Sequence, residues 1–475
     1  MKSIYKVLGI VVTFLLLQSC FVAKDYEEPE NIIVEEELYR TDEIPQDSIG
    51  NMADLSWTEI FTDSYLREYI NKALTNNVDI RIALQQIAAA EAYIKQGKAG
   101  YLPSLNAGAD YTLTYPSKNG SQGALLSQTG SDHVEIFNLS GNLSWEADVW
   151  GKIRSQKRAF DASYLQTVAA HQAVKTGLIA RVAATYYQLL AIDKQIKVTE
   201  QTVETRFRSL ETTRSLKEAG AGNITSTAVQ QTEAQYLDAK SMLIDLKNQA
   251  RLLENVMSLL MGEEPHSIER SELDQQNITT ELKVGVPIEL LSNRPDVIMA
   301  ENNYRQAFEM KNVARANFYP SFTIGAAGGI ESLKLDNWFD ANSLFANVLG
   351  GITAPIFNGR QIRTQFEVSQ IQQEQARLDY RGVLLVATKE VSDALFNYES
   401  ASEKIEIKKD QRELLEQAVE DSQALLESGY NNFSYLEVLT AQESVLNSSL
   451  DVINAELSQL ISMIDLYEAL GGGWK

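Results

Sequence analysis

The stretch GYLPSLNAGADYTLTYP, residues 100–116, follows a helical pattern and alternates between apolar and polar residues. From Leu105 to Tyr115 the odd positions are Leu, Ala, Ala, Tyr, Leu and Tyr, and the even positions are Asn, Gly, Asp, Thr and Thr. Alternation with a period of two is typical of a β-strand that has one apolar face. The sequence therefore predicts a strand over about 104–116.

Three further segments predict strands, over about 134–147, 321–331 and 343–355. Each is long enough to cross a bilayer as a tilted strand, which takes about 9–11 residues. The alternative is a water-soluble sheet that packs one face against a hydrophobic core. The Gly- and Ser-rich segment 117–133 is expected to be a loop.

The two halves of the chain can be aligned as a tandem repeat of about 210 residues. An offset of 217 pairs Asp79 with Asp296, Ala83 with Ala300 and Pro103 with Pro320, and an offset of 209 pairs Gly220 with Gly429 and Gly262 with Gly471. We expect a first structural repeat over 61–262, a connector over 263–287 and a second repeat over 288–475.

Proline positions permit very long helices. No proline lies between 117 and 264 or after 355, and proline is strongly disfavoured inside a helix. Long helices are therefore predicted over 152–219 and 361–428, with returning helices over 225–261 and 434–470. Apolar residues three and four apart form a stripe on the first long helix: Leu165, Val168, Ala169, Leu178, Val182, Tyr186 and Leu189. Such helices, roughly 100 Å long, would pack as coiled coils.

The N-terminus resembles a bacterial lipoprotein signal. Lys2 and Lys6 precede an apolar run of eleven residues, 7–17, which is too short to span a membrane. The following LQSC resembles a lipobox that ends at Cys20, the single cysteine of the chain. We expect a signal peptide over 1–19 and a lipid anchor with an extended linker over 20–60. An unmodified cysteine near an ordinary cleavage site is the alternative.

Composition argues against nucleic-acid binding and catalysis. The chain has 42 Lys and Arg against 64 Asp and Glu, a net charge of −22, which disfavours a nucleic-acid partner. The histidines His133, His171 and His266 are scattered, without partners at ligand or catalytic spacing. We expect no enzyme activity, no cofactor and no metal site.

Four strands cannot close a barrel, and open sheet edges are not tolerated in lipid. Three chains would supply twelve strands, with the apolar face toward lipid and the Asn, Thr, Ser and Asp residues around a water-filled lumen. The fold class predicted is mostly α with a transmembrane β-barrel.

Several motifs, in order, resemble the TolC-like outer-membrane factor family, and most closely its efflux lipoproteins. They are VGVPIELLSNRPDVIMAE, ANFYPSF, APIFNGRQIR, YRGVLLVATKEVSDAL, GYNNFSYLEVLTAQ and ALGGGW. The resemblance implies a homotrimer whose 12-strand outer-membrane β-barrel is continuous with a 12-helix periplasmic α-barrel. It implies a passive conduit that exports drugs, detergents or metal ions. The implied partners are a periplasmic adaptor, an inner-membrane transporter of the resistance-nodulation-division type and outer-membrane lipid of a Gram-negative bacterium.

The resemblance also implies where the periplasmic end closes. The family's constriction falls on Leu436 and Thr440, and Glu437 could supply acidity nearby or serve only as a helix cap with Ser434. Many relatives have Asp at the position of Thr440, which puts a triple-carboxylate ring in doubt. The adaptor is expected at the helix turns, which contain Gly220, Gly222, Asn223, Gly429, Tyr430 and Asn431.

Two other functions stay open on the sequence: a type I protein-secretion channel of the same architecture, and a lipid-anchored periplasmic coiled-coil scaffold. The RPD motif at 294–296 could be a functional charge. A proline followed by an acidic residue is, however, typical of a helix N-terminus, and we favour that interpretation.

Overall fold

The computed structural model of the chain describes residues 22–27, 55–220, 224–276, 293–427 and 435–474. They divide into two compact units. Of the described residues, unit 1 holds 22–27, 88–166 and 300–379, and unit 2 holds the remainder. No helix in these ranges has a stretch apolar enough to cross a membrane.

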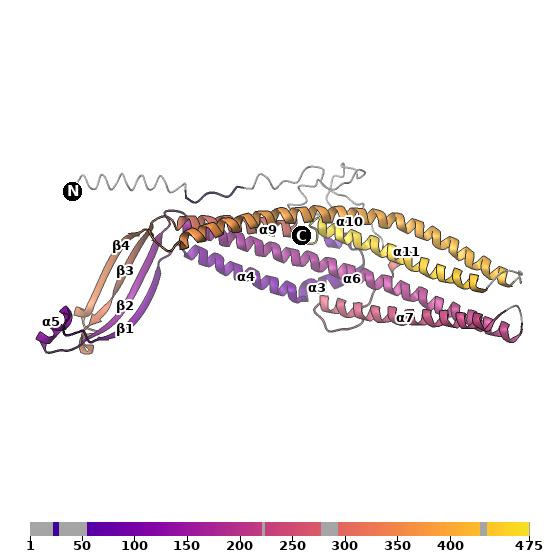
Figure 1. The fold of residues 1–475 in the computed structure, drawn as a ribbon, viewed down its shortest axis with the longest axis horizontal. Coiled ribbons are helices and arrows are strands. Elements are labelled where there is room, and N and C mark those ends of the chain that lie inside the picture. Colours follow the sequence, from indigo (N-terminus) through magenta and orange to yellow (C-terminus); the bar gives the residue numbers. More distant parts are fainter. Residues whose placement is uncertain (1–21, 28–54, 221–223, 277–292, 428–434, 475) are drawn as a thin grey trace. The chain divides into compact units, whose positions relative to one another are not determined.

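Unit 1 contains one antiparallel sheet whose strands lie side by side in the order β1-β2-β3-β4 (Figure 1). The strands are β1 (Ser104–Thr114), β2 (Val134–Ala147), β3 (Ser321–Ser332) and β4 (Leu344–Thr353). The sequence analysis expected 104–116, 134–147, 321–331 and 343–355. Sequential strands are neighbours throughout, although β2 and β3 are far apart in the chain.

The expected loop 117–133 instead contains a helix, α5 (Ser121–Thr129). Gly130 ends it in the left-handed conformation, with φ of 76°, which glycine adopts without strain. The Gly and Ser residues of the segment led to the prediction of a loop, although its centre around Leu125 is apolar. Two 3-10 turns, η4 (Leu335–Asn337) and η5 (Ala341–Ser343), lie between β3 and β4.

The helices occur in pairs of equal length. The helices α6 (Lys152–Glu218) and α10 (Gln361–Glu427) have 67 residues each, and α7 (Ser226–Leu260) and α11 (Tyr435–Ala469) have 35 each. Likewise α4 (Val78–Ala99) and α9 (Pro295–Ala316) have 22 each. In unit 2, α7 runs beside α6 and α11 beside α10, joined by ion pairs such as Lys247–Glu200 and Lys408–Asp451 (Figure 1).

The helix expected before Gly100 is two helices, α3 (Ser64–Asn76) and α4, because Asn77 interrupts it. The Asn77 Oδ1 accepts hydrogen bonds from the backbone N–H groups of Asp79 (2.8 Å) and Ile80 (3.3 Å) and so caps α4. Its Nδ2 donates to the carbonyl of Leu260 at 2.9 Å. The break therefore ties α4 to the end of α7.

The main core lies in unit 2, between α2 (Trp57–Ile60), α3, α6, α7, α10 and α11. Leu178, Val182, Tyr186 and Leu189 of the predicted stripe are almost fully buried in it. Leu165, in the same stripe, lies in unit 1 and is 43% exposed in the single chain.

The expected extended linker 20–60 is also wrong at its end, because residues 57–60 form α2. Trp57 and Ile60 are buried in the core. Ser56 and Glu59 form a capping box that starts this helix, in which the Ser56 N–H donates to the Glu59 carboxylate at 2.9 Å. The sequence pattern Ser-x-x-Glu carried this signal.

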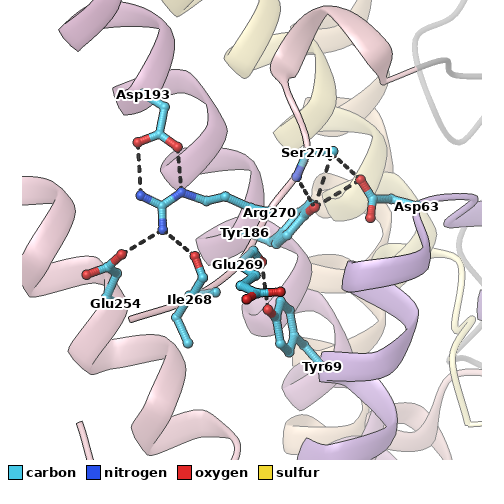
Figure 2. Close-up of polar contacts among 9 residues, drawn as sticks. All are labelled: Asp63, Tyr69, Tyr186, Asp193, Glu254, Ile268, Glu269, Arg270 and Ser271. Atoms are coloured by element: carbon cyan, nitrogen blue, oxygen red, sulfur yellow. Dashed lines mark hydrogen bonds and ion pairs between the residues drawn. The ribbon is translucent and has the colours of Figure 1, made fainter. Parts of the chain in front are cut away.

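Arg270 holds the described part of the connector against two helices (Figure 2). Its Nε and Nη2 donate to the Asp193 carboxylate at 2.5 and 2.9 Å, and its Nη1 donates to Glu254 at 2.7 Å and to the carbonyl of Ile268 at 2.8 Å. The Arg270 side chain is 13% exposed. A two-pronged bond to one carboxylate fixes direction as well as distance.

Asp63 joins α3 to α6 and the connector (Figure 2). Its Oδ2 accepts from the Tyr186 hydroxyl and from Gln276 Nε2, each at 2.9 Å, and from the Ser271 hydroxyl. Its Oδ1 caps α3 through the N–H groups of Tyr65 and Leu66. Burial opposes the charged form, yet these hydrogen bonds hold the pKa of Asp63 below its ordinary value.

We expect Arg270→Ala to lower the free energy of unfolding by about 2–3 kcal/mol, because it leaves two partly buried carboxylates without their cation. Urea denaturation followed by circular dichroism measures this. The control is Arg214→Ala, which removes a solvent-exposed pair with Glu233 and is expected to cost less than about 0.5 kcal/mol. Equal losses in both variants would contradict the role of Arg270.

We expect the stability difference between the wild type and Asp63→Asn to depend on pH. Since folding lowers the pKa of Asp63, its carboxylate stabilises the fold fully above the unfolded pKa. The difference, about 1 kcal/mol at pH 7, should shrink as the pH falls below about 4. Unfolding free energies between pH 7 and pH 3 test this, with the exposed Asp245→Asn as control. A difference that stays constant to pH 3 would refute it.

Candidate functional site

The register of the sheet places most of its apolar residues on one face, which also carries Glu135 and Ser332 near its end. Leu105 lies opposite Leu143, Leu143 opposite Ala326, and Ala326 opposite Val348. Residues opposite each other in a ladder share a face, and every second residue joins them. We call this surface the apolar face: Leu105, Ala107, Ala109, Tyr111 and Leu113; Phe137, Leu139, Gly141, Leu143 and Trp145; Phe322, Ile324, Ala326, Gly328 and Ile330; Leu344, Ala346, Val348, Gly350 and Ile352.

The opposite face carries the polar residues. It includes Asn106, Asp110, Thr112, Asn138, Ser140, Asn142, Ser144, Glu146, Thr323, Glu331 and Asn347. Five apolar residues lie among them: Val134, Ile136, Ala327, Phe345 and Leu349. One side of the sheet is therefore suited to water and the other to an apolar phase. On the apolar face Leu105 is 72% and Val348 77% exposed, so neither is covered by the described parts of this chain.

The sheet has two free edges. In the described part of the chain, β1 pairs only with β2 and β4 only with β3. Their outer edges therefore present unpaired N–H and C=O groups, which in an apolar phase need partners from another strand.

Aromatic residues with polar contacts lie at the end of the sheet next to the helices. Trp145 Nε1 donates to the carbonyl of Tyr101 at 2.9 Å, and Trp150 Nε1 to that of Pro320 at 2.7 Å. The ring of Trp150 lies 5.0 Å from that of Tyr319. Tryptophan and tyrosine gather where an apolar phase meets water.

Residues 22–27, expected to be linker, pack against α6 and α9. Val22 is buried beside Trp150 and Ala316, and the Lys24 carbonyl accepts from Asn312 Nδ2 at 2.9 Å. The ring of Tyr26 lies 5.9 Å from that of Tyr304 and 5.7 Å from that of Phe308, and the Arg305 guanidinium lies 4.6 Å above it. In the sequence, the apolar Val22 and the aromatic Tyr26, which stand among charged residues, are the features that could have indicated this contact. Cys20 lies outside the described residues.

The residues predicted for the periplasmic gate lie in the first two turns of α11. Leu436 is 52% exposed, and Glu437 and Thr440 are also exposed. Val438 and Leu439 between them are buried. The Thr440 hydroxyl donates to the Leu436 carbonyl at 2.9 Å, so both residues lie on one side of the helix.

Of the residues predicted to contact an adaptor, Gly220 ends α6 with φ of 62°, where a Cβ would meet no atom within 4 Å. The remaining predicted residues, Gly222, Asn223, Gly429, Tyr430 and Asn431, lie outside the described residues, as does Ser434.

The helix-start interpretation of the RPD motif is confirmed. Pro295 is the first residue of α9 and Asp296 lies in its first turn. Arg294 is buried, and donates to Asp296 (2.8 Å), to Glu390 (2.5 Å) and to the carbonyl of Ala469 (2.7 Å). It therefore ties the start of α9 to α10 and α11.

The chain is similar to known efflux proteins over nearly its whole length. The chain is 26% identical over 466 residues to the cation efflux system protein CusC of Escherichia coli O6:H1, covering 97% of each chain. It is 28% identical to the probable efflux pump outer membrane protein TtgC of Pseudomonas putida, covering 98% of this chain and 95% of TtgC. A crystal structure of CusC superposes with a TM-score of 0.82 at 25% identity, covering 95% of this chain and all of that one.

The sequence model of the family described as "outer membrane efflux protein" matches residues 69–263 and 286–472. These two segments cover most of the chain, and they include the four strands and all four of the longest helices. This is a family of transport conduits of the outer membrane of Gram-negative bacteria, and the chain belongs to it.

Proposed function

We propose that the chain is the outer-membrane channel of a tripartite efflux system, a passive conduit that three copies build together. The observation that carries this proposal is the sheet, with its continuous apolar face, its polar opposite face and its two free edges. Three copies would join these edges into a closed 12-strand barrel with the apolar face toward lipid. Closure gives every edge group a partner, which a single chain cannot do.

The proposed architecture rests on an internal duplication. Each half supplies a helix of 22 residues, two strands, a helix of 67 residues and a returning helix of 35 residues. Equal lengths in the same order support a tandem repeat over 61–262 and 288–475, with a connector over 263–287. In a trimer the helices would form a 12-helix α-barrel across the periplasm.

A lipid at Cys20 would lie close to the membrane boundary. Only residue 21 separates Cys20 from Val22, which packs against Trp150 at the helix-side end of the sheet. An acyl chain on Cys20 would thus enter the bilayer at the level of the aromatic residues. We propose that residues 22–27 position the anchor, after removal of a signal peptide over 1–19.

At the other end of the helices, we propose that Leu436 and Thr440 of three chains form the gate. Three leucines around an axis leave little room for hydrated solutes. Thr440 brings no charge, so acidity near the gate would come from Glu437. The periplasmic adaptor would contact the turns that contain Gly220 and Gly429, and an inner-membrane pump would supply the solute.

The relatives are named for cation, antibiotic and toluene efflux. For this chain we propose export of small solutes of this kind. Susceptibility profiling of a deletion strain against drugs, detergents and metal ions tests the class. An unchanged profile, with loss of a secreted protein instead, would favour protein secretion.

We expect Val348→Arg to prevent assembly in the outer membrane, because it places a charge on the apolar face at a cost of about 2–4 kcal/mol per chain. The matched control is Asn347→Arg, one residue away on the polar face. Folded trimer in outer-membrane fractions, detected by its resistance to unfolding in mild detergent, measures the difference. Similar yields of both variants would contradict a lipid-facing apolar face.

We expect Leu436→Ala to raise single-channel conductance in planar bilayers roughly several-fold, because the smaller alanine side chain would widen the proposed apolar constriction. Leu252→Ala, a change at an exposed leucine of α7, serves as control and should leave conductance unchanged. A small conductance that persists in Leu436→Ala would remove this residue from the gate.

A further inference from the structure

The segments that join the helices of unit 1 to its sheet are basic, although the whole chain has a net charge of −22. They are 95–101 at the end of α4, 150–158 at the start of α6, 311–320 at the end of α9 and 355–363 at the start of α10. In this order they contain two, four, two and two Lys or Arg residues, ten together, and no Asp or Glu. Each connection to the sheet therefore carries positive charge on its helix side.

Half of these ten cations are neutralised by nearby carboxylates. The paired ones are Lys152, Lys157, Arg158, Arg360 and Arg363. Within the described part of the chain, the other five side chains form no ion pair: Lys95, Lys98, Arg154, Lys311 and Arg315. The same holds for Lys24 of the segment 22–27. The carboxylate of Asp148 does not serve Arg154 as a counter-ion, because it accepts from the backbone N–H groups of Ile153 and Arg154 at 2.9 and 2.8 Å and so caps α6.

The two unpaired cations of α9 lie close to Lys24. Arg315 Nη1 donates to the carbonyl of Val22 at 3.4 Å. Asn312 Nδ2 donates to the carbonyl of Lys24 at 2.9 Å, and Asn312 Oδ1 accepts from the Lys24 N–H at 3.4 Å. Burial, followed by repulsion from Arg315 and Lys24, lowers the pKa of Lys311. An anion placed among these three cations would relieve their repulsion.

Arg154 of α6 adjoins the same segment. A Cβ on Gly151 would lie 2.8 Å from the Cβ of Ala23 and 2.8 Å from Arg154 Nη2, so the guanidinium group and residue 23 are neighbours. Lys24 and Arg154 are exposed, and Lys311 and Arg315 are half-buried, so an anion can reach all of them. We call these four side chains the basic patch: Lys24, Arg154, Lys311 and Arg315.

The place of the basic patch indicates a membrane lipid as its partner. Val22 is buried beside Trp150, and Phe322, at the end of the apolar face, packs against the same cluster. Arg154 and Arg315 lie seven and six residues from the ends of β2 and β3. Lipid headgroups begin where the apolar core of a bilayer ends, and long cationic side chains extend toward them. If the apolar face lies in lipid, headgroup phosphates are within reach of the patch.

We propose that the basic patch binds the headgroup phosphates of anionic phospholipids in the membrane leaflet that holds the Cys20 anchor. Clusters of Lys and Arg beside an apolar phase attract anionic headgroups, and each cation adds to the attraction. The contact holds residues 22–27 at the membrane boundary together with the acyl chain. The proposal rests on the channel proposed above, because it needs the apolar face in lipid.

The test places the purified full chain in bilayers that contain brominated phosphatidylglycerol or brominated phosphatidylcholine. Bromine on an acyl chain quenches the fluorescence of tryptophans that the lipid contacts, and Trp145 and Trp150 lie at this end of the sheet. Phosphatidylglycerol, which is anionic, should bind roughly tenfold more tightly than the zwitterionic phosphatidylcholine. High salt should reduce this preference, because it screens exposed charges.

Lys311→Gln with Arg315→Gln should reduce the preference for phosphatidylglycerol about threefold or more. The matched control is Lys247→Gln with Arg251→Gln, which removes the same two charges at the same spacing on α7 of unit 2. It should keep the preference of the wild type.

Lys24→Gln separates loss of the site from loss of the fold, because Asn312 bonds only the backbone of Lys24. It should reduce the preference about twofold. Equal binding of both lipids to the wild type, or equal losses in the two double variants, would overturn the proposal. The channel proposal would survive either result, since bromine would still reach the apolar face. An absence of quenching by both lipids would overturn the two proposals together.

Discussion

The backbone of the sheet imposes the constraint on which the rest of the molecule depends. A strand in an apolar phase must have both its edges paired, since no water is present to satisfy N–H and C=O groups. The outer edges of β1 and β4 have no strand partner in the described chain, and the apolar face is exposed. In the channel proposed above, strands of other copies would pair with these edges, and the family's outer-membrane location provides the apolar phase.

Unit 2 has a different requirement: its long helices must keep a fixed register against one another. An apolar core alone allows packed helices to slide, whereas directed polar bonds do not. Arg270, Asp63 and Arg294 provide such bonds, and each ties residues that are far apart in the chain. These groups set the position of the connector, of α3 and of α9 on the same core.

Much of this could be predicted from local patterns. The period-two alternation predicted the strands. The proline-free gaps permitted long helices, and composition with apolar spacing predicted α6 and α10 with their bounds within one residue. The break at Asn77, the helix α5 and the packing of residues 22–27 could not be predicted in this way. For Asn77 and residues 22–27 the deciding contact is a distant partner: Asn77 donates to the Leu260 carbonyl, and Tyr26 packs on Tyr304 and Phe308.

The sequence by itself determined which strand residues share an apolar face and which share a polar one, because a period of two assigns each strand residue to a face without reference to the rest of the fold. Its motifs also indicated the family. Only the tertiary structure decided which charges are paired. Arg294 lies next to Asp296 in the chain, but Glu390 and the Ala469 carbonyl reach it from other helices. Such pairing depends on distances between helices that no local pattern encodes.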